Sequence, residues 1–332
     1  MPFRAISGHR VVLDLLSRAT ARGTLPPSLI FAGPSGVGKR LAATALAQAL
    51  NCLHPIESDE GRDACGVCTA CTRIARGVHG DILAIEPVDS GNIKLDQVRE
   101  AIERCAYRPF EGRRRVVIVD EADALLPDAQ NALLKTLEEP PPASVFVLVT
   151  SRPDVLLPTV RSRCQRLRFG PLTPAEVADV LIRDHGVAAG EAPAAAAAAD
   201  GSVGRALADS AEDANDARNA AARLLQAAAT SADPRRRLDG ARALGNGASD
   251  RDELARRLLA LSSMLRDMGL MLSQADERAL ANADLAPQLR ALLRSFDAER
   301  TVEAFAAVDR ALSALDRSAS PKIVADWLAL NL

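Results

Sequence analysis

The sequence predicts an α/β domain built on a parallel sheet, followed by a region made entirely of helices. Three observations support this fold class. The 332 residues are too many for one ordinary hydrophobic core, which indicates two or three domains. From Phe3 to about Gly170, short apolar runs alternate with segments of helical periodicity, as in a parallel sheet covered by helices. After Pro171 the strand-like runs stop, and only helical patterns follow.

In the first part of the chain, each predicted strand is a short apolar run. The runs expected as strands are Ser28–Ala32, Asp81–Glu86, Arg115–Asp120 and Ser144–Thr150. The segments expected as helices are Arg40–Leu50, Ile93–Ala106 and Asp128–Glu138. The last two strands have unbroken apolar centres, which predicts that both of their faces are buried. Pro140–Pro142 ends the last of these helices, because proline cannot continue a helix.

The second part begins with a signal for the start of a helix. Thr173 and Glu176 form a capping box, with Pro174 at the first helical position. The tract Ala194–Ala199 is predicted as helix because alanine has the highest helix propensity. Asp252–Leu272 keeps one apolar face, which we expect to be buried. The leucines of that face are Leu254, Leu258, Leu261 and Leu265.

A glycine-rich loop joins the first predicted strand to the first predicted helix. It matches the phosphate-loop pattern G-x-x-x-x-G-K-[ST] at every position except the last. Its residues are Gly33, Pro34, Ser35, Gly36, Val37, Gly38, Lys39 and Arg40. The glycines let backbone N–H groups converge on phosphate oxygens at a helix N-terminus, and Lys39 would reach the outer phosphates.

The defect in this loop lies at its final position. A hydroxyl there normally binds magnesium, and Arg40 has no side-chain oxygen to replace it. Hydrolysis of a nucleotide depends on that metal. The sequence therefore predicts a loop that keeps its shape with weak or absent turnover, and it leaves open the binding of ATP without hydrolysis.

The strand that ends at Asp120 has the features of a Walker B element. Its apolar run is followed by Asp120, which would hold magnesium, and by Glu121, which would polarise the attacking water. An acidic pair that caps a helix is the alternative interpretation. The residues Asp120-Glu-Ala-Asp123 also spell a helicase motif. A helicase needs a second domain with strands, however, and the second half of the chain predicts only helices.

Four of the six cysteines fall in one short segment. They are Cys52, Cys65, Cys68 and Cys71. Thiolates at this spacing converge on a tetrahedral zinc ion, and Gly66 permits the tight turn between ligands. We therefore expect a structural zinc knuckle over residues 52–71 with four cysteine ligands. His54 as a ligand, an iron–sulfur cluster and reactive surface cysteines are the alternatives.

Two further segments resemble the bacterial DNA polymerase III clamp-loader family of AAA+ proteins. They are Asn131-Ala-Leu-Leu-Lys-Thr-Leu-Glu-Glu-Pro140 and Thr159-Val-Arg-Ser-Arg-Cys164. With the phosphate loop, the cysteines and the Walker B element, the recognisable motifs cover about the first two thirds of the chain. Three features make the chain most similar to the delta-prime branch of that family. These features are Arg40, the sequence Gly204-Arg-Ala-Leu207, and an end at residue 332 without the long extension that motor subunits often carry.

The resemblance implies roles for individual residues. Arg163 matches the arginine finger, which reaches in trans into the ATP site of the neighbouring subunit. Thr150 matches the first sensor of the terminal phosphate. Arg205 is the nearest match to the second sensor, but Gly204 stands where motor subunits carry that arginine. Arg161 lies close enough to be confused with Arg163, and the alternative for Arg163 is a surface arginine paired within its own domain.

The resemblance also implies an architecture and a set of partners. Residues 1–170 would form a RecA-like AAA+ domain, residues 171–210 a small helical lid, and residues 211–332 a helical collar domain for oligomerisation. The chain would be a stator in a hetero-pentamer with motor and delta subunits, which loads the sliding clamp at primed DNA during replication. Zinc is the expected structural cofactor, whereas the defect at Arg40 argues against ATP with magnesium in the chain's own site.

Two other functions compete with this interpretation. One is an active gamma/tau-type motor subunit, which would be an ATPase in its own right. The other is a purely structural zinc-binding scaffold, against which Asp120, Glu121 and the Ser162-Arg-Cys164 segment argue.

The bulk composition limits the possible location and partners. The net charge is −2, so any contact with DNA requires a local patch or an assembly. Arg113–Arg115 is either such a patch or a solvated basic turn. The first residues lack the apolar segment of a signal peptide, and no apolar run of about 18 residues predicts a membrane span. We therefore expect a cytoplasmic protein without membrane contact.

Overall fold

The computed structural model describes most of the chain as two compact units. The described residues are 1–58, 61–88, 91–208, 211–230, 233, 235, 237–238, 251–274, 280–316 and 319–332. The first unit comprises Met1–Glu176 with Ser202–Gly204, and the second comprises Val177–Gly201 with Arg205–Leu332. The boundary expected at residue 210 lies outside the described residues. None of the described helices has the length and apolarity needed to cross a membrane.

The first unit is built on a parallel sheet. Within the described residues its strands run in the order β4 (Ile82–Ile85), β5 (Arg115–Val119), β6 (Ser144–Thr150), β1 (Ser28–Ala32) and β7 (Gln165–Arg168). All neighbouring strands in this sheet are parallel. Every residue of β1, β5 and β6 is buried, as the apolar centres of β5 and β6 predict. The edge strand β7 was not predicted, because Leu167 is its only buried residue.

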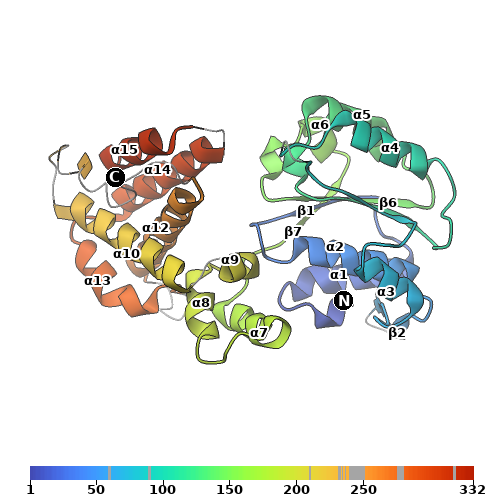
Figure 1. The fold of residues 1–332 in the computed structure, drawn as a ribbon, viewed down its shortest axis with the longest axis horizontal. Helices are drawn as coiled ribbons and strands as arrows, with labels where there is room; N and C mark the ends of the chain where they lie inside the picture. Colours follow the sequence, from blue (N-terminus) through green and yellow to red (C-terminus); the bar gives the residue numbers. More distant parts are fainter. Residues whose placement is uncertain are drawn as a thin grey trace. The chain divides into compact units, whose positions relative to one another are not determined.

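Helices cover both faces of this sheet (Figure 1). They are α1 (Arg10–Arg22), α2 (Lys39–Asn51), α3 (Thr69–Ala75), α4 (Leu95–Cys105), α5 (Pro127–Glu138) and α6 (Pro158–Arg161), with 3-10 turns at Phe3–Ala5, Ala122–Ala124 and Pro153–Val155. Leu29 and Phe31 of β1 face the core that contains α1 and α2. Ile30 and Ala32 face the opposite core, which contains α4 and α5. Successive side chains of a strand point to opposite faces, so β1 joins two hydrophobic cores.

A buried carboxylate shapes the loop between α4 and β5. Asp81 is 0% exposed and pairs with the Arg115 guanidinium at 2.9 Å. Its oxygens also accept the backbone N–H groups of Phe110, Glu111 and Gly112 at 2.7–2.8 Å. Behind the same loop, the Asn51 side chain accepts two more backbone N–H groups, those of residues 113 and 114. These contacts provide partners for both oxygens of the buried carboxylate and fix the path of the loop.

The second unit is helical throughout its described residues. Its helices are the remainder of α7 (Pro174–His185), α8 (Ala192–Ala198), α9 (Val203–Ala208), α10 (Ala211–Thr230), α12 (Arg251–Leu272), α13 (Ala286–Leu292), α14 (Ala298–Asp316) and α15 (Pro321–Leu330), with a 3-10 turn at Ala283–Leu285. The predicted capping box forms, because Thr173 N–H donates to Glu176 and Glu176 N–H donates to Thr173 Oγ1. The four leucines predicted to share a face of α12 are all buried.

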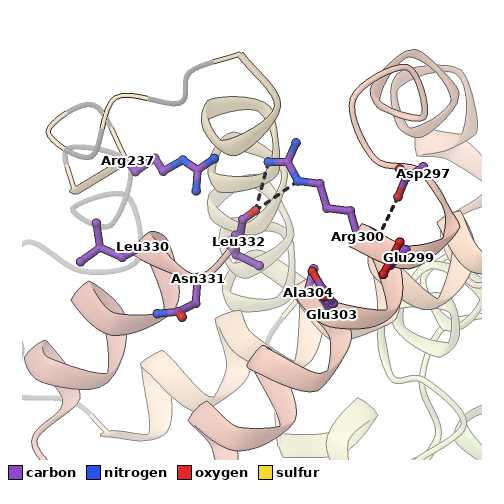
Figure 2. Close-up of a pocket in the computed structure, with 9 residues that line it drawn as sticks. All are labelled: Arg237, Asp297, Glu299, Arg300, Glu303, Ala304, Leu330, Asn331 and Leu332. Carbon is purple, nitrogen blue, oxygen red and sulfur yellow. Dashed lines mark hydrogen bonds between the residues drawn. The ribbon is translucent and has the colours of Figure 1, made fainter.

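An arginine at the start of α14 joins several elements of the second unit. Arg300 donates to the backbone oxygens of Ala228, Ser295 and Leu332 at 2.8–3.0 Å. Its guanidinium also lies 4.3 Å from the ring centroid of Phe296. Figure 2 shows the two bonds from Arg300 to Leu332, in a pocket that Asp297 also lines. Arg300 thus ties α10, α14 and the segment after α15 together.

Candidate functional site

The phosphate loop connects β1 to α2 at the carboxyl edge of the sheet. The Gly33 N–H donates to the Thr150 carbonyl at 3.2 Å, which places the end of β6 against the loop. Gly36 and Gly38 have φ angles of +73° and +96°, a left-handed conformation that favours glycine. A Cβ on Gly33 would lie 2.1 Å from the carbonyl oxygen of Phe169. The loop therefore needs glycine at each of these positions, as the motif predicts.

The side chain of Lys39 folds back onto its own loop. Its Nζ donates to the carbonyl oxygens of Gly33 at 2.8 Å and Pro34 at 2.5 Å, and the residue is buried. Burial lowers the pKa of the Lys39 ammonium, and the charges of Asp123 and Asp120 offset that effect only in part. The ammonium predicted to bind phosphate thus donates to two backbone carbonyls of its own loop.

Ser202–Gly204, which belong to the first unit, pack against the same loop. The Gly204 N–H donates to the carbonyl of Gly36 at 3.1 Å. A Cβ on Gly36 would lie 2.2 Å from Ser202 Oγ, and a Cβ on Gly204 would lie 3.0 Å from the Cα of Gly36. The two glycines therefore allow two backbones to approach closely. Gly204, which the family comparison marked as a departure from the motor subunits, has this steric role. Arg205 lies on α9 in the second unit.

Arg40 forms ion pairs with two carboxylates at the ends of neighbouring strands. Its Nη1 lies 3.0 Å from Asp120 Oδ2, and its Nη2 pairs with Glu86. Glu86 follows β4 and Asp120 follows β5, and the ends of these two strands, Ile85 and Val119, are partners in the sheet. The role of Glu86 was not predicted, although its place directly after an apolar run marks it as a residue at the carboxyl edge.

These residues do not fit a magnesium ion with its usual ligands. The position beside Asp120 is taken by a guanidinium, and residue 40 provides no hydroxyl. A divalent cation there would be repelled by the positive charge of Arg40. Because the Arg40 side chain is 54% exposed, we assign its ion pairs at most about 1 kcal/mol of stability each. Their importance lies in the chemistry of the site rather than in the stability of the fold.

The other residues predicted for this edge have their own partners. Glu121 is exposed, has a φ of +46°, and its N–H donates to Asp120 Oδ1 at 3.0 Å. Thr150 is buried, and its hydroxyl donates to Asp123 Oδ1 at 2.7 Å. The second oxygen of Asp123 accepts from Arg152 Nε at 3.0 Å. Asp123, which was not predicted as a site residue, therefore orients Thr150 beside the Walker B strand.

Arg163 lies at the opposite edge of the sheet from the phosphate loop. It precedes β7, and the loop follows β1, which is parallel to β7 and hydrogen-bonded to it. The four residues of β7 span about 13 Å. Arg163 donates to Glu138 Oε2 from Nε and Nη2, at 3.2 and 3.0 Å, and to the carbonyl of Thr159 at 3.1 Å. Arg161 instead pairs with Asp154 at 2.8 Å.

The four clustered cysteines meet as predicted. Their Sγ atoms all lie within 4.8 Å of one another, and those of Cys52 and Cys68 are 3.9 Å apart. In a tetrahedral site with Zn–S bonds of 2.3 Å, neighbouring sulfurs are about 3.8 Å apart. Among the described residues, the ligand atoms that gather here are these four thiols and not the ring of His54. The donor set fits a zinc ion.

Backbone N–H groups around the cluster favour thiolates. The N–H groups of Cys65 and Cys68 donate to the preceding sulfurs, at 3.2 and 3.3 Å. Burial alone would raise the pKa of Cys68, but the N–H groups of Cys71 and Leu53 and the neighbouring thiols outweigh it and lower that pKa to about 6. Burial raises the pKa of Cys52, so metal binding there would displace a proton.

The segment that carries the cysteines is hydrogen-bonded to the N-terminal 3-10 turn and to α2. It follows α2 and contains a hairpin of β2 (Ile56–Ser58) and β3 (Gly61–Asp63). Arg4 donates to the carbonyl oxygens of Ala64 at 2.7 Å and Cys65 at 3.1 Å. The Gln48 side chain on α2 donates to the carbonyl of Cys71 at 2.7 Å. A metal ion here would therefore fix a surface hairpin to the body of the first unit.

Comparisons with known proteins agree with these features. The family model described as "DNA polymerase III, delta subunit" matches residues 8–173, half of the chain. The chain is 36% identical to the gamma/tau subunit of DNA polymerase III from Mycobacterium tuberculosis, over 54% of this chain and 31% of that protein. It is also 36% identical to the delta' subunit from Bacillus subtilis, over 52% of this chain and 50% of that protein.

A second delta' subunit, from Pseudomonas aeruginosa, is 38% identical over 45% of each chain. The matched part of this chain thus spans about half or less of the length of these relatives. The identities to gamma/tau and delta' subunits are similar, so they do not distinguish the two kinds. The extent of the family match, together with the phosphate loop, the Walker B strand and the cysteine cluster, shows that the chain belongs to the bacterial DNA polymerase III clamp-loader family.

Proposed function

We propose that this chain is the delta-prime subunit of a bacterial DNA polymerase III clamp loader, a stator that lends Arg163 to the ATP site of a neighbouring subunit. The observation that carries the proposal is the position of Arg163 at the amino edge of the sheet. The chain's own phosphate loop lies at the carboxyl edge, which supports a role for Arg163 at a nucleotide held by another subunit. An arginine in that role stabilises the charge of the transferring phosphoryl group.

The pairing of Arg163 with Glu138 is compatible with this role. The Glu138 side chain is 59% exposed and the Arg163 side chain 32%, so the pair is worth about 0–1 kcal/mol. A triphosphate carries more charge than one carboxylate and accepts charge-assisted hydrogen bonds from both arms of a guanidinium. The neighbour's nucleotide would therefore draw Arg163 away from Glu138 at little cost.

The chain's own nucleotide site supports the assignment as a stator. Arg40 occupies the position beside Asp120, Lys39 is engaged by loop carbonyls, and Gly204 packs on Gly36. Thr150 and Glu121 would be remnants of the catalytic apparatus in this subunit, and so would Arg205 as second sensor. The expected ATPase activity of the isolated chain is weak or absent.

The proposed architecture follows the family. Residues 1–170 form the AAA+ domain, residues 171–210 the lid, and residues 211–332 the collar that assembles with motor and delta subunits into a pentamer. In that assembly the chain helps to open the sliding clamp and load it at primed DNA in the cytoplasm. Zinc, held by the four cysteines, has a structural role.

The test is the ATPase rate of the reconstituted loader with primed DNA and clamp. Arg163→Ala should lower the rate at the neighbouring site by about 10³-fold or more, because an arginine finger contributes that much. Arg161→Ala is the matched control, two residues away and paired with Asp154, and should leave the rate unchanged. Equal rates for the wild type and Arg163→Ala would rule out the stator role.

A second candidate is an active motor subunit of the gamma/tau kind. It is favoured by the intact Lys39, Asp120 and Glu121 and by the equal identity to gamma/tau relatives. The two candidates differ in the turnover of the purified chain. Magnesium-dependent hydrolysis by the chain alone, abolished by Lys39→Ala, would establish the motor and overturn the stator.

A further inference from the structure

The pair formed by Glu86 and Asp120 needs a cation. The two residues follow adjacent parallel strands at the same edge of the sheet, and both carboxylates contact one guanidinium. Two carboxylates held this close repel each other unless a positive charge lies between them. Asp120 is the more enclosed of the two, with 17% of its side chain exposed, so solvent alone compensates it only in part.

Arg40 is the residue whose side chain supplies that charge. Lys39, the other cation of the loop, directs its Nζ to the carbonyls of Gly33 and Pro34 instead. Arg40 also lies in the first turn of α2, where the helix dipole disfavours a positive charge and where no acidic residue is present. A cation in this unfavourable position indicates that its two carboxylate partners hold it there.

Other groups of the phosphate loop also bond within the chain. Lys39 Nζ donates to two carbonyls of the loop, and the carbonyl of Gly36 accepts the Gly204 N–H. Residue 40 is the position at which this loop departs from the pattern of a metal-dependent phosphate loop.

We infer that Arg40 is a built-in cation that replaces the divalent metal at the Walker B carboxylates and makes the site indifferent to magnesium. Removal of its charge should leave Asp120 and Glu86 free to hold a divalent ion. This inference deepens the proposed function, since it rests on the assignment of the chain as a subunit that does not turn over its own nucleotide. It also predicts that one substitution restores metal dependence.

The experiment compares Arg40→Thr, which restores the hydroxyl of the phosphate-loop pattern, with the wild-type full chain. The probe is a fluorescent ADP analogue, titrated with and without MgCl2. Magnesium should be omitted rather than chelated, because a chelator would also remove metal from the cysteine cluster. The wild type should show no gain in affinity from magnesium, and Arg40→Thr should gain about tenfold or more.

Two further variants make the result specific. Arg40→Lys keeps the positive charge and should remain indifferent to magnesium. Asp120→Asn, added to Arg40→Thr, should remove the gain, because the metal loses its carboxylate. Far-ultraviolet circular dichroism should be the same for all variants, since Arg40 is half exposed and makes no core contact.

Two outcomes would overturn the inference. One is a wild-type chain whose affinity already rises tenfold with magnesium. The other is a folded Arg40→Thr chain that shows no magnesium-dependent binding. Neither outcome bears on Arg163, whose test uses the assembled loader, so failure of this inference and failure of the stator assignment are distinguishable.

Discussion

Arg163 donates two hydrogen bonds to a single oxygen of Glu138, from Nε at 3.2 Å and from Nη2 at 3.0 Å. Both side chains remain partly exposed to water. The geometry holds the guanidinium in one place without burying it. The proposed role of Arg163 requires an ion pair of this kind, because a buried ion pair would cost several kcal/mol to break.

The first prediction concerns the energy of this pair. Glu138→Gln and Arg163→Ala should each change the free energy of unfolding by less than about 1 kcal/mol. Thermal or urea unfolding of the isolated chain measures this. Arg115→Ala provides the contrast, because it leaves the buried Asp81 carboxylate without its cation and should cost about 3–5 kcal/mol. If Arg163→Ala destabilised the chain as much as Arg115→Ala, Arg163 would be a structural residue.

The second prediction concerns the metal. The purified chain should contain one zinc ion, measured by elemental analysis, and Cys68→Ser should lose it because the four thiolates act together. Cys105→Ser is the control, since this buried cysteine lies on α4 outside the cluster, and it should keep the zinc. Full zinc content in Cys68→Ser would contradict the four-cysteine site. Iron with visible absorbance would indicate an iron–sulfur cluster instead.

The third prediction concerns acid stability. Burial alone would raise the pKa of Asp81, but the N–H groups of Glu111, Gly112 and Phe110 and the Arg115 guanidinium lower it from 3.8 to about 2. A carboxyl whose pKa is lower in the folded state stabilises that state above its unfolded pKa and loses the effect as the pH falls through the folded pKa. The loss should amount to roughly 2 kcal/mol between about pH 4 and pH 2.

Asp81→Asn isolates this contribution from other effects of acid. The difference in unfolding free energy between the wild type and Asp81→Asn, measured with urea at several pH values, should shrink over that interval. Other titrating groups are common to both chains and cancel. A difference that stayed constant from pH 5 to pH 2 would show that Asp81 does not have a lowered pKa in the folded chain.

Several elements of the fold were predictable because their signals are local. The apolar runs of β5 and β6 and the leucine face of α12 were predicted and are confirmed. β7 was missed because an edge strand needs only one buried side chain, here Leu167. The hairpin of β2 and β3 was also missed, since its strands are short and all their residues except Gly61 are exposed or half-buried.

The residues of the site were likewise predictable where the signal is local, and not where it depends on distant parts of the chain. The phosphate loop and the four cysteines are contiguous patterns, so their convergence could be predicted. The partners of Arg40, Thr150 and Arg163 could not, because Glu86, Asp123 and Glu138 are 25–46 residues away from them in the sequence. Such pairs arise from strand order, which no single stretch of sequence contains.

The loop between α4 and β5 is held through its backbone and not through its exposed side chains. Asp81 and Asn51 fix the path of the loop, because their side-chain oxygens accept its backbone N–H groups. Tyr107 and Phe110 on the same loop are 76% and 87% exposed, and their rings take no part in those bonds. The two exposed rings therefore do not hold the backbone of the loop in this conformation. Substitution of either exposed ring should therefore leave the backbone of the loop unchanged.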